Sequence, residues 1–228
     1  MLKPLTAPVG TPGWGSPRRW SVFATGYVAL ICGIAMSITA GLGVGSWQVL
    51  ETGLISLTGA SFGVVAFVEA VVARAIAGVL LGQRPWIATA LLAGAGVGIG
   101  ALVDVMATPE ALLGRVALLS VAMVLLAIGV AFYLASDLGA SAQDAIFVGL
   151  YTRYALRPGR VRFVMDGLLV VAGMLIGGQF GIGTLAVTIV VPLLIEPALR
   201  LGHHLADTPL PESLVVATVP LIDPAECT

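Results

Sequence analysis

The sequence predicts an all-α polytopic membrane protein, a helical bundle of six spans in two inverted repeats with short non-spanning helices. The first observation is composition: 58% of the 228 residues are apolar and 10% are charged, whereas a soluble domain carries about 25% charged residues. The second is length, since the charge-free runs reach the roughly 20 residues that a spanning helix needs. The third is an internal repeat, because residues 42–83 recur 96 positions later as 138–179.

The repeat is a set of identities in one frame, with the apolar runs also in phase. These identities are Leu42-Gly43 with Leu138-Gly139, Gly53-Leu54 with Gly149-Leu150, Gly63 with Gly159, and Gly82-Gln83 with Gly178-Gln179. Each repeat holds three predicted spans, and an odd number turns the second repeat upside down relative to the first. Many secondary transporters are built in this way, with the substrate site near the midplane where the repeats meet.

The predicted elements follow from the apolar runs and the glycine-rich or proline-rich breaks between them. The spans cover residues 21–41, 62–81, 86–105, 112–135, 163–179 and 184–201, and the short helices cover 47–58 and 142–154. A helix of the latter length cannot cross about 30 Å of hydrocarbon, so each short helix either lies at the interface or re-enters the membrane. Ser141 and Asp144 have capping-box spacing at the second one, and Pro192 and Pro197 predict that the last span is kinked or split.

The chain therefore divides into a cytoplasmic segment 1–20, repeat 1 at 21–106, repeat 2 at 112–201 and a tail at 202–228. Basic residues set the orientation. With both termini in the cytoplasm, nine of the eleven basic residues fall inside, as the positive-inside rule requires. The nine are Lys3, Arg18, Arg19, Arg84, Arg153, Arg157, Arg160, Arg162 and Arg200. This distribution predicts a multi-pass protein of the plasma membrane.

Glu69 and Arg74 lie inside a predicted span, where a charge costs several kcal/mol and usually faces a cavity or a partner. They are five positions apart, so they share a helix face poorly and each needs its own partner. Alternatively, Arg74 snorkels to the interface. Asp166 falls within one residue of the repeat equivalent of Glu69. The two acids could carry protons or cations, or Asp166 could form an interfacial ion pair with Arg162, four residues earlier.

The remaining candidate residues belong to the short helices. Gln48 and Asp144 are repeat equivalents near the two helix starts, where a polar group either binds a ligand or caps the helix. If both helices re-enter the membrane, their N-termini meet near one centre and would suit an anion or a carbonyl group. Glu51 is either a gate residue or part of a solvated face. Trp47 either lines the site with Gln143 or anchors the helix in the aromatic belt.

Several functions are not predicted. A net charge of −1 does not favour nucleic acid. His203 and His204 stand without a Cys or an acid at ligand spacing, so no metal is expected. The glycine-rich stretches lack the Gly-Lys-Ser/Thr of a phosphate loop. With no catalytic constellation in view, neither an enzyme nor a cofactor is expected.

The ordered glycine motifs resemble those of the YczE-like, YitT-related bacterial membrane proteins over about residues 25–201. The resemblance rests on Gly43-x-Gly45-x-Trp47-x-Val49-Leu50-x-x-Gly53-Leu54, Thr58-Gly59-x-Ser61-x-Gly63, Gly82-Gln83-x-Pro85, Asp137-Leu138-Gly139, Gln143-Asp144 and Gly177-Gly178-x-x-Gly181-x-Gly183-Thr184. The chain departs from the family at Ser46-Trp47, where Pro-Trp is expected, at Ala88-Thr89 in place of Gly-Thr, and at Asp166 in place of Glu. The resemblance implies the bundle architecture and does not identify a substrate.

The leading hypothesis is a transporter of an unknown small solute, either facilitated or coupled to protons or sodium. The alternative is a non-transporting scaffold or assembly factor, whose cytoplasmic arginines at 153–162 and proline-rich tail would recruit membrane lipid or a protein partner. Glycines on several faces of the spans would also allow a homodimer.

Overall fold

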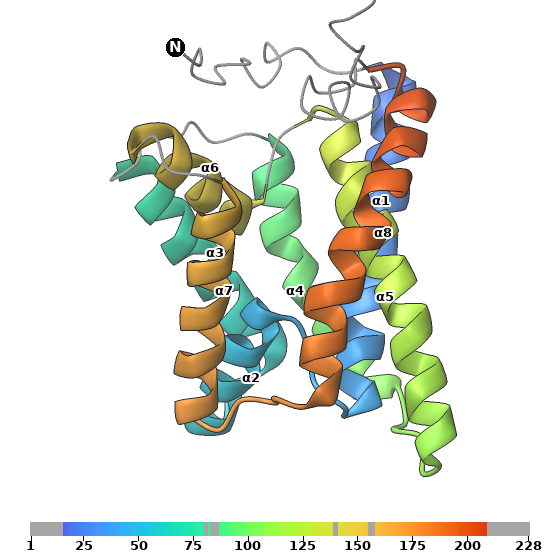
Figure 1. Cartoon of the computed structure of the whole chain (residues 1–228), viewed down its shortest axis with the longest axis vertical. Helices are drawn as coiled ribbons and strands as arrows, with labels where there is room; N and C mark the ends of the chain where they lie inside the picture. The colour runs from blue at the N-terminus through green and yellow to red at the C-terminus, as the bar shows by residue number, and fades with distance from the viewer. Residues whose placement is uncertain (1–15, 80–81, 83–86, 139–140, 155–157, 209–228) are drawn as a thin grey trace, which may run out of the picture.

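The computed structural model describes residues 16–79, 82, 87–138, 141–154 and 158–208, and all regular structure in these residues is α-helical. Eight helices form within these ranges, with no strand among them (Figure 1). They are α1 (Pro17–Ala40), α2 (Ser46–Thr58), α3 (Phe62–Val79), α4 (Ile87–Val105), α5 (Leu112–Ala135), α6 (Ala142–Tyr154), α7 (Pro158–Leu175) and α8 (Ile182–Ala206). Each of them corresponds to one predicted element, so the all-α prediction is confirmed.

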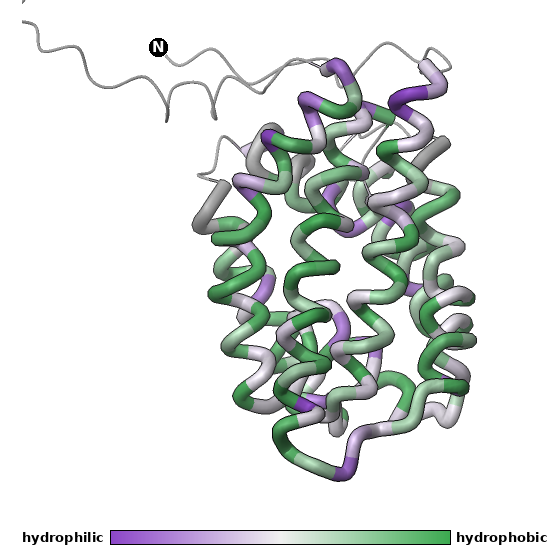
Figure 2. Tube along the Cα trace, turned by 90° about the vertical axis from the view of Figure 1, so that its right-hand side faces the viewer, coloured by the Kyte–Doolittle hydropathy of each residue, from purple (hydrophilic) through white to green (hydrophobic). Residues whose placement is uncertain are grey.

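Four of the helices in the described part, α1, α3, α5 and α8, are long and apolar enough to cross a membrane. The apolar portions of α4 and α7 are shorter, at Ala90–Val105 and Phe163–Leu175. Figure 2 shows a largely hydrophobic middle between ends where hydrophilic residues gather. The protein is therefore a membrane-embedded helical bundle, while the count of six spans remains a prediction.

Helix boundaries depart from the prediction at prolines. α1 and α7 begin earlier than expected, at Pro17 and Pro158, because proline fits the first helical turn, where no N–H bond is lost. Ser16 caps α1 by accepting a hydrogen bond from the Arg19 N–H at 3.4 Å. α8 is one helix of 25 residues that contains both Pro192 and Pro197. Of the predicted kink or split, the split does not occur, since neighbouring groups in a membrane bundle can satisfy the carbonyls that a proline frees.

Local signals bound the two short helices. α2 begins after extended Gly45 and ends at Gly59, whose left-handed φ of 70° lets its N–H bond the Ile55 carbonyl. At α6, the Ser141 hydroxyl accepts from the Asp144 N–H at 3.0 Å and donates to the Asp144 carboxylate at 2.7 Å. The predicted side-chain cap at Ser141 is confirmed.

The helices form two groups with α4 between them. The three-helix group consists of α1, α5 and α8, and the four-helix group consists of α2, α3, α6 and α7, while α4 packs on both α1 and α3. The short helices lie at opposite ends of the four-helix group, α2 at the lower end and α6 at the upper end in Figure 1. α3 packs on α4, but α7 and α8 form no comparable interface in the described part of the chain.

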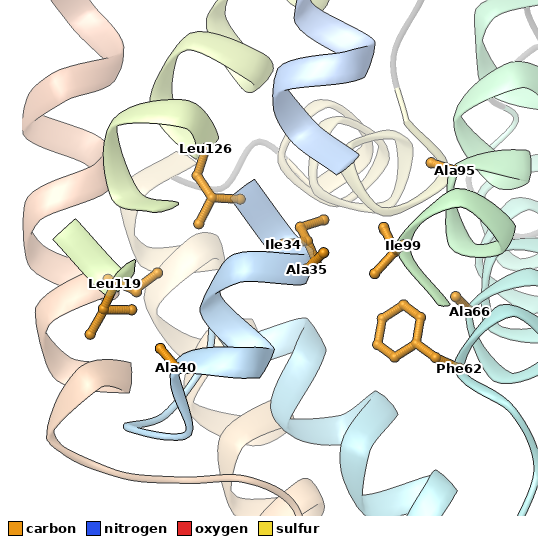
Figure 3. Packing of buried hydrophobic residues seen from close by; sticks show 10 residues of the cluster. Ile34, Ala35, Ala40, Phe62, Ala66, Ala95, Ile99, Leu119 and Leu126 are labelled. Atoms are coloured by element: carbon orange, nitrogen blue, oxygen red, sulfur yellow. The ribbon is translucent and has the colours of Figure 1, made fainter. Parts of the chain in front are cut away.

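The three-helix group is held by close approach of α1 and α5. A Cβ on Gly26 or Gly129 would lie within 3.0 Å of backbone atoms of the opposite helix, so these helices meet at a distance that only glycine allows. On the other face of α1, Ile34 belongs to a buried cluster with Ile99 of α4 and Phe62 of α3 (Figure 3). α1 therefore joins the two groups through α4.

A second connection joins the loop after α1 to the start of α8. The Gly183 N–H donates to the Leu42 carbonyl at 2.8 Å. The buried Thr184 hydroxyl accepts from the N–H groups of Val44 at 3.1 Å and Gly181 at 3.3 Å. Because these N–H groups lie where no helix satisfies them, Thr184 ties the loop after α1 to the start of α8 at this end.

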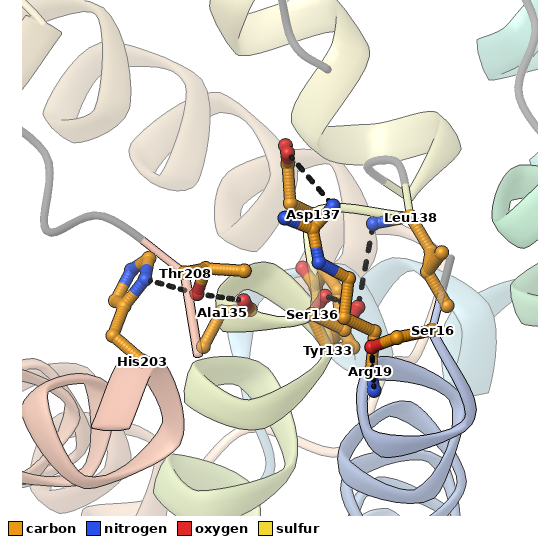
Figure 4. Close-up of polar contacts among 9 residues, drawn as sticks. All are labelled: Ser16, Arg19, Tyr133, Ala135, Ser136, Asp137, Leu138, His203 and Thr208. Atoms are coloured by element: carbon orange, nitrogen blue, oxygen red, sulfur yellow. Dashed lines mark hydrogen bonds and ion pairs between the residues drawn. The ribbon is translucent and has the colours of Figure 1, made fainter. Parts of the chain in front are cut away.

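Polar contacts also close the opposite end, as Figure 4 shows. Thr208 donates to the Ala135 carbonyl at 2.8 Å and contacts the ring of His203 at 2.8 Å. Arg19 lies 3.7 Å from the Asp137 carboxylate. His203 therefore belongs to the end of α8 and not to the tail.

We expect Gly129→Ala to destabilise the protein by about 1 to 3 kcal/mol, the usual range for overpacking. The added methyl would lie 2.7 Å from the Leu30 backbone nitrogen. Thermal unfolding in detergent measures the change. Gly167→Ala is the matched control, because nothing lies within 4 Å of its Cβ position. Equal melting temperatures for the two variants would contradict the close α1–α5 contact.

We expect Thr184→Val to destabilise the protein by about 1 to 3 kcal/mol for each N–H that loses its acceptor. Valine keeps the shape of threonine, so the effect isolates the hydroxyl. Thr25→Val is the control, because Thr25 is exposed and its hydroxyl bonds within α1 to the Ser21 carbonyl. A Thr184→Val protein that melts with the control would show that these loops are held by other contacts.

Candidate functional site

A cavity of about 630 Å³ lies between the two helix groups, and all eight described helices contribute to its wall. Polar side chains gather where the first turns of α2 and α6 reach it, among them Ser46, Gln48 and Asp144. Apolar residues of α1, α4, α5 and α8 cover most of the remaining wall. We call this space the central cavity.

Six of the eight residues that the sequence singled out line the central cavity. They are Trp47, Gln48 and Glu51 on α2, Gln143 and Asp144 on α6, and Asp166 on α7. α2 and α6, which carry five of the six, lie at opposite ends of the bundle (Figure 1). The tertiary structure thus brings together candidates separated by almost 100 positions.

Glu69 and Arg74 are not on the wall of the central cavity. Glu69 lines a neighbouring apolar cavity of about 550 Å³ between α2, α3 and α7. Its Oε2 accepts a hydrogen bond from Gln143 Nε2 at 2.9 Å, so Gln143 links Glu69 to the central cavity. Arg74 is partly buried on α3 and lines neither cavity.

The first turn of each short helix donates a hydrogen bond to a carboxylate on a long helix. Gln143 of α6 bonds Glu69 of α3, and the Ser46 hydroxyl of α2 bonds Asp166 Oδ1 of α7 at 2.6 Å. At the repeat offset of 96, these pairs correspond to within one residue at both ends. The side chain of Arg162, the other predicted partner of Asp166, lies outside the described residues.

Asp144 is held by its neighbours. Its carboxylate accepts from the Ser141 hydroxyl at 2.7 Å and from the Tyr133 hydroxyl of α5. Tyr133 is buried and also lines the central cavity. The contact therefore fixes the start of α6 against the three-helix group and orients one carboxylate on the cavity wall.

Glu51 has a different environment. It is 4% exposed, it lines the central cavity, and its Oε2 has no hydrogen-bond partner among the residues that the structure describes. The repeat equivalent of Glu51 is Phe147, which packs edge-to-face on Trp47 with ring centroids 6.3 Å apart. The cavity thus combines an unsatisfied carboxylate oxygen with an aromatic wall.

Sequence reasoning missed Ser46, Tyr133 and Phe147. Phe147 could have been found from the repeat, because it is the equivalent of Glu51. Tyr133 lies in a long apolar run, and no local pattern distinguishes it from a packing residue. Within the described residues, no group of three or more His, Cys, Asp or Glu side chains is placed to hold a metal ion.

Comparison with known proteins places the chain among relatives defined by sequence. Residues 17–198 match the model of the "Family of unknown function (DUF6198)". An uncharacterized protein of Haemophilus influenzae (strain ATCC 51907 / DSM 11121 / KW20 / Rd) is 26% identical over 181 residues, covering 75% of this chain and 82% of that protein. No solved structure matches the chain. The resemblance to YczE-like and YitT-related proteins remains a prediction. Because the family model covers the helical bundle almost completely, the chain belongs to the DUF6198 family.

Proposed function

We propose that this protein carries a small solute across the plasma membrane through the central cavity. The observation that supports this most is the position of the first turns of α2 and α6. They belong to helices at opposite ends of the bundle (Figure 1), yet both line one cavity of about 630 Å³. A cavity of this size is typical of small-molecule sites, and transporters with inverted repeats place such a site where the repeats meet.

The packing of the helices supports an inverted repeat. If α1–α4 and α5–α8 are equivalent units, a contact between α2 and α7 requires a matching contact between α6 and α3. Both contacts occur, and α2 packs on α3 as α6 packs on α7. The two hydrogen bonds from short helices to carboxylates follow the same exchange. Each repeat therefore supplies a short helix to the other repeat.

The orientation that we propose has both termini in the cytoplasm, with six spans. Arg18, Arg19 and Arg200 belong to the end of the bundle that carries the α1 start and the α8 end. Arg115 belongs to the start of α5, at the opposite end, where it donates to the Pro109 carbonyl at 2.8 Å. This separation follows the positive-inside rule.

Coupling, if the transport is active, would use the acids that the short helices contact. Glu69 and Asp166 are the proposed carriers of a proton or sodium ion, because each accepts a hydrogen bond from the first turn of a short helix. A change in their protonation would alter that contact and with it the position of the short helix. Arg74 would serve as a counter-ion on α3.

Cavity access tests the proposal. In a protein without native cysteines (Cys32→Ser, Cys227→Ser), we expect Ala93→Cys and Thr188→Cys to react with a membrane-impermeant thiol reagent in proteoliposomes. Both residues line the central cavity, and a transport site must be open to water from at least one side. The measurement is the labelled fraction, with reagent added outside, inside or on both sides.

The control is Val124→Cys on α5, which is 47% exposed in the structure and lines neither cavity. It should face lipid and stay unlabelled. If the two cavity positions are as unreactive as Val124→Cys from both sides, the transporter proposal fails. The alternative function, a non-transporting scaffold that recruits lipid or a protein partner, would then be favoured. Most side chains of its basic segment, 153–162, lie outside the described residues.

A further inference from the structure

We propose that the central cavity binds a hydrophobic amine in its protonated form, with the ammonium group on Glu51. This inference rests on the proposed function and names the chemical class of the solute. It starts from one atom: Glu51 Oε2 is a buried acceptor with no hydrogen-bond partner in the described part of the chain, on a residue that is 4% exposed and lines the cavity.

A buried carboxylate oxygen without a partner is costly, because a charge removed from water needs a paired donor. Other cavity carboxylates already have donors. Ser141 and Tyr133 donate to Asp144, and Ser46 donates to Asp166. Glu51 therefore has spare acceptor capacity on the cavity wall, and an ammonium group supplies both the N–H donors and the opposite charge.

The charge of the wall selects against anions. Glu51, Asp144 and Asp166 all line the central cavity, and none of its described lining residues is Lys, Arg or His. An anionic solute would meet like charges in an apolar environment, where the repulsion is weakly screened. The sequence predicted an anion or a carbonyl group at the helix N-termini. The charge of this wall instead favours a cationic ligand.

The rest of the wall fits a carbon body. Trp47 and Phe147 form an edge-to-face pair with centroids 6.3 Å apart, and both line the cavity beside Phe163 and Tyr133. Aromatic faces attract organic cations as well as apolar groups. The volume of about 630 Å³ falls within the range of roughly 300 to 1,000 Å³ that holds drug-sized ligands.

The weak packing between α7 and α8 suggests a path by which such a molecule would enter the cavity from the membrane. Phe163 and Asp166 of α7 and Val191 of α8 lie on the same cavity wall, although α7 and α8 form no interface comparable to that of α3 and α4 in the described part. A solute with an apolar body could pass between these helices from the membrane, while its ammonium group turns towards Glu51.

The test uses three probes with one carbon cage and different charge: adamantanamine, adamantanol and adamantane carboxylate. Binding of each to the full-length protein in lipid nanodiscs is measured by calorimetry, with empty nanodiscs subtracted to remove partitioning. We expect saturable binding of the amine, at least about tenfold weaker binding of the alcohol because its charge-assisted bond is lost, and no binding of the carboxylate.

The variant Glu51→Gln keeps the size of the side chain and removes its charge. We expect it to weaken amine binding by about 10- to 100-fold, the loss of a hydrogen bond to a charged group. Glu196→Gln is the matched control: Glu196 is exposed on α8, bonds Arg200 at 2.7 Å and does not line the cavity. It should bind the amine as the unchanged protein does.

The outcomes separate this inference from the proposed function. If the alcohol or the carboxylate binds as tightly as the amine, the amine proposal is wrong, even where the cavity cysteines react from water. If Glu51→Gln binds the amine normally, Glu51 is not the ammonium partner and the proposal is also overturned. If Glu51→Gln fails to fold, the ranking of the three probes on the unchanged protein still decides the charge class.

Discussion

Polar groups inside an apolar bundle must find partners within the protein, and this constraint organises the molecule. The short helices bring their first turns among long apolar helices, onto the wall of the central cavity. Ser46 and Gln143 satisfy this constraint by donating hydrogen bonds to Asp166 and Glu69, each in the other half of the chain. Thr184 satisfies it by accepting from the N–H groups of Val44, in the loop after α1, and of Gly181, just before α8. Three of these four contacts, those of Ser46, Gln143 and the Val44 N–H, cross from one half of the sequence to the other, so neither half completes these polar bonds alone.

The same constraint draws attention to two residues on the cavity wall. Most polar atoms near the central cavity have partners supplied by the fold, whereas Glu51 Oε2 and Trp47 Nε1 have none among the described residues. Native proteins seldom leave such an atom unsatisfied without a reason. A solute-binding role gives that reason, because the missing donor then comes from outside the chain. α3 and α4 pack against each other, whereas α7 and α8 form no comparable interface in the described residues. The cavity wall between α7 and α8 is therefore not closed by helix packing of the kind that joins α3 and α4.

Much of the fold could be predicted from sequence because the signals are local. Apolar run length identifies the helices, and glycine at Gly59 or a serine cap at Ser141 marks their ends. The absence of a split in α8 has a physical cause: proline is a helix breaker in water, but in a bundle the surrounding helices compensate for it. The repeat offset also pointed to Gln48 and Asp144, which share a cavity although they lie 96 positions apart.

The sequence by itself determined the membrane class, the helical elements and the repeat, since composition, run length and spacing are written along the chain. The tertiary structure alone decided which candidates converge. It placed Glu69 beside the central cavity and not on its wall, brought Tyr133 to Asp144 from an apolar run, and left Glu51 without a donor. These outcomes depend on which helix faces which neighbour. In an apolar bundle that is set by close packing at residues such as Gly129, whose partners are distant in sequence.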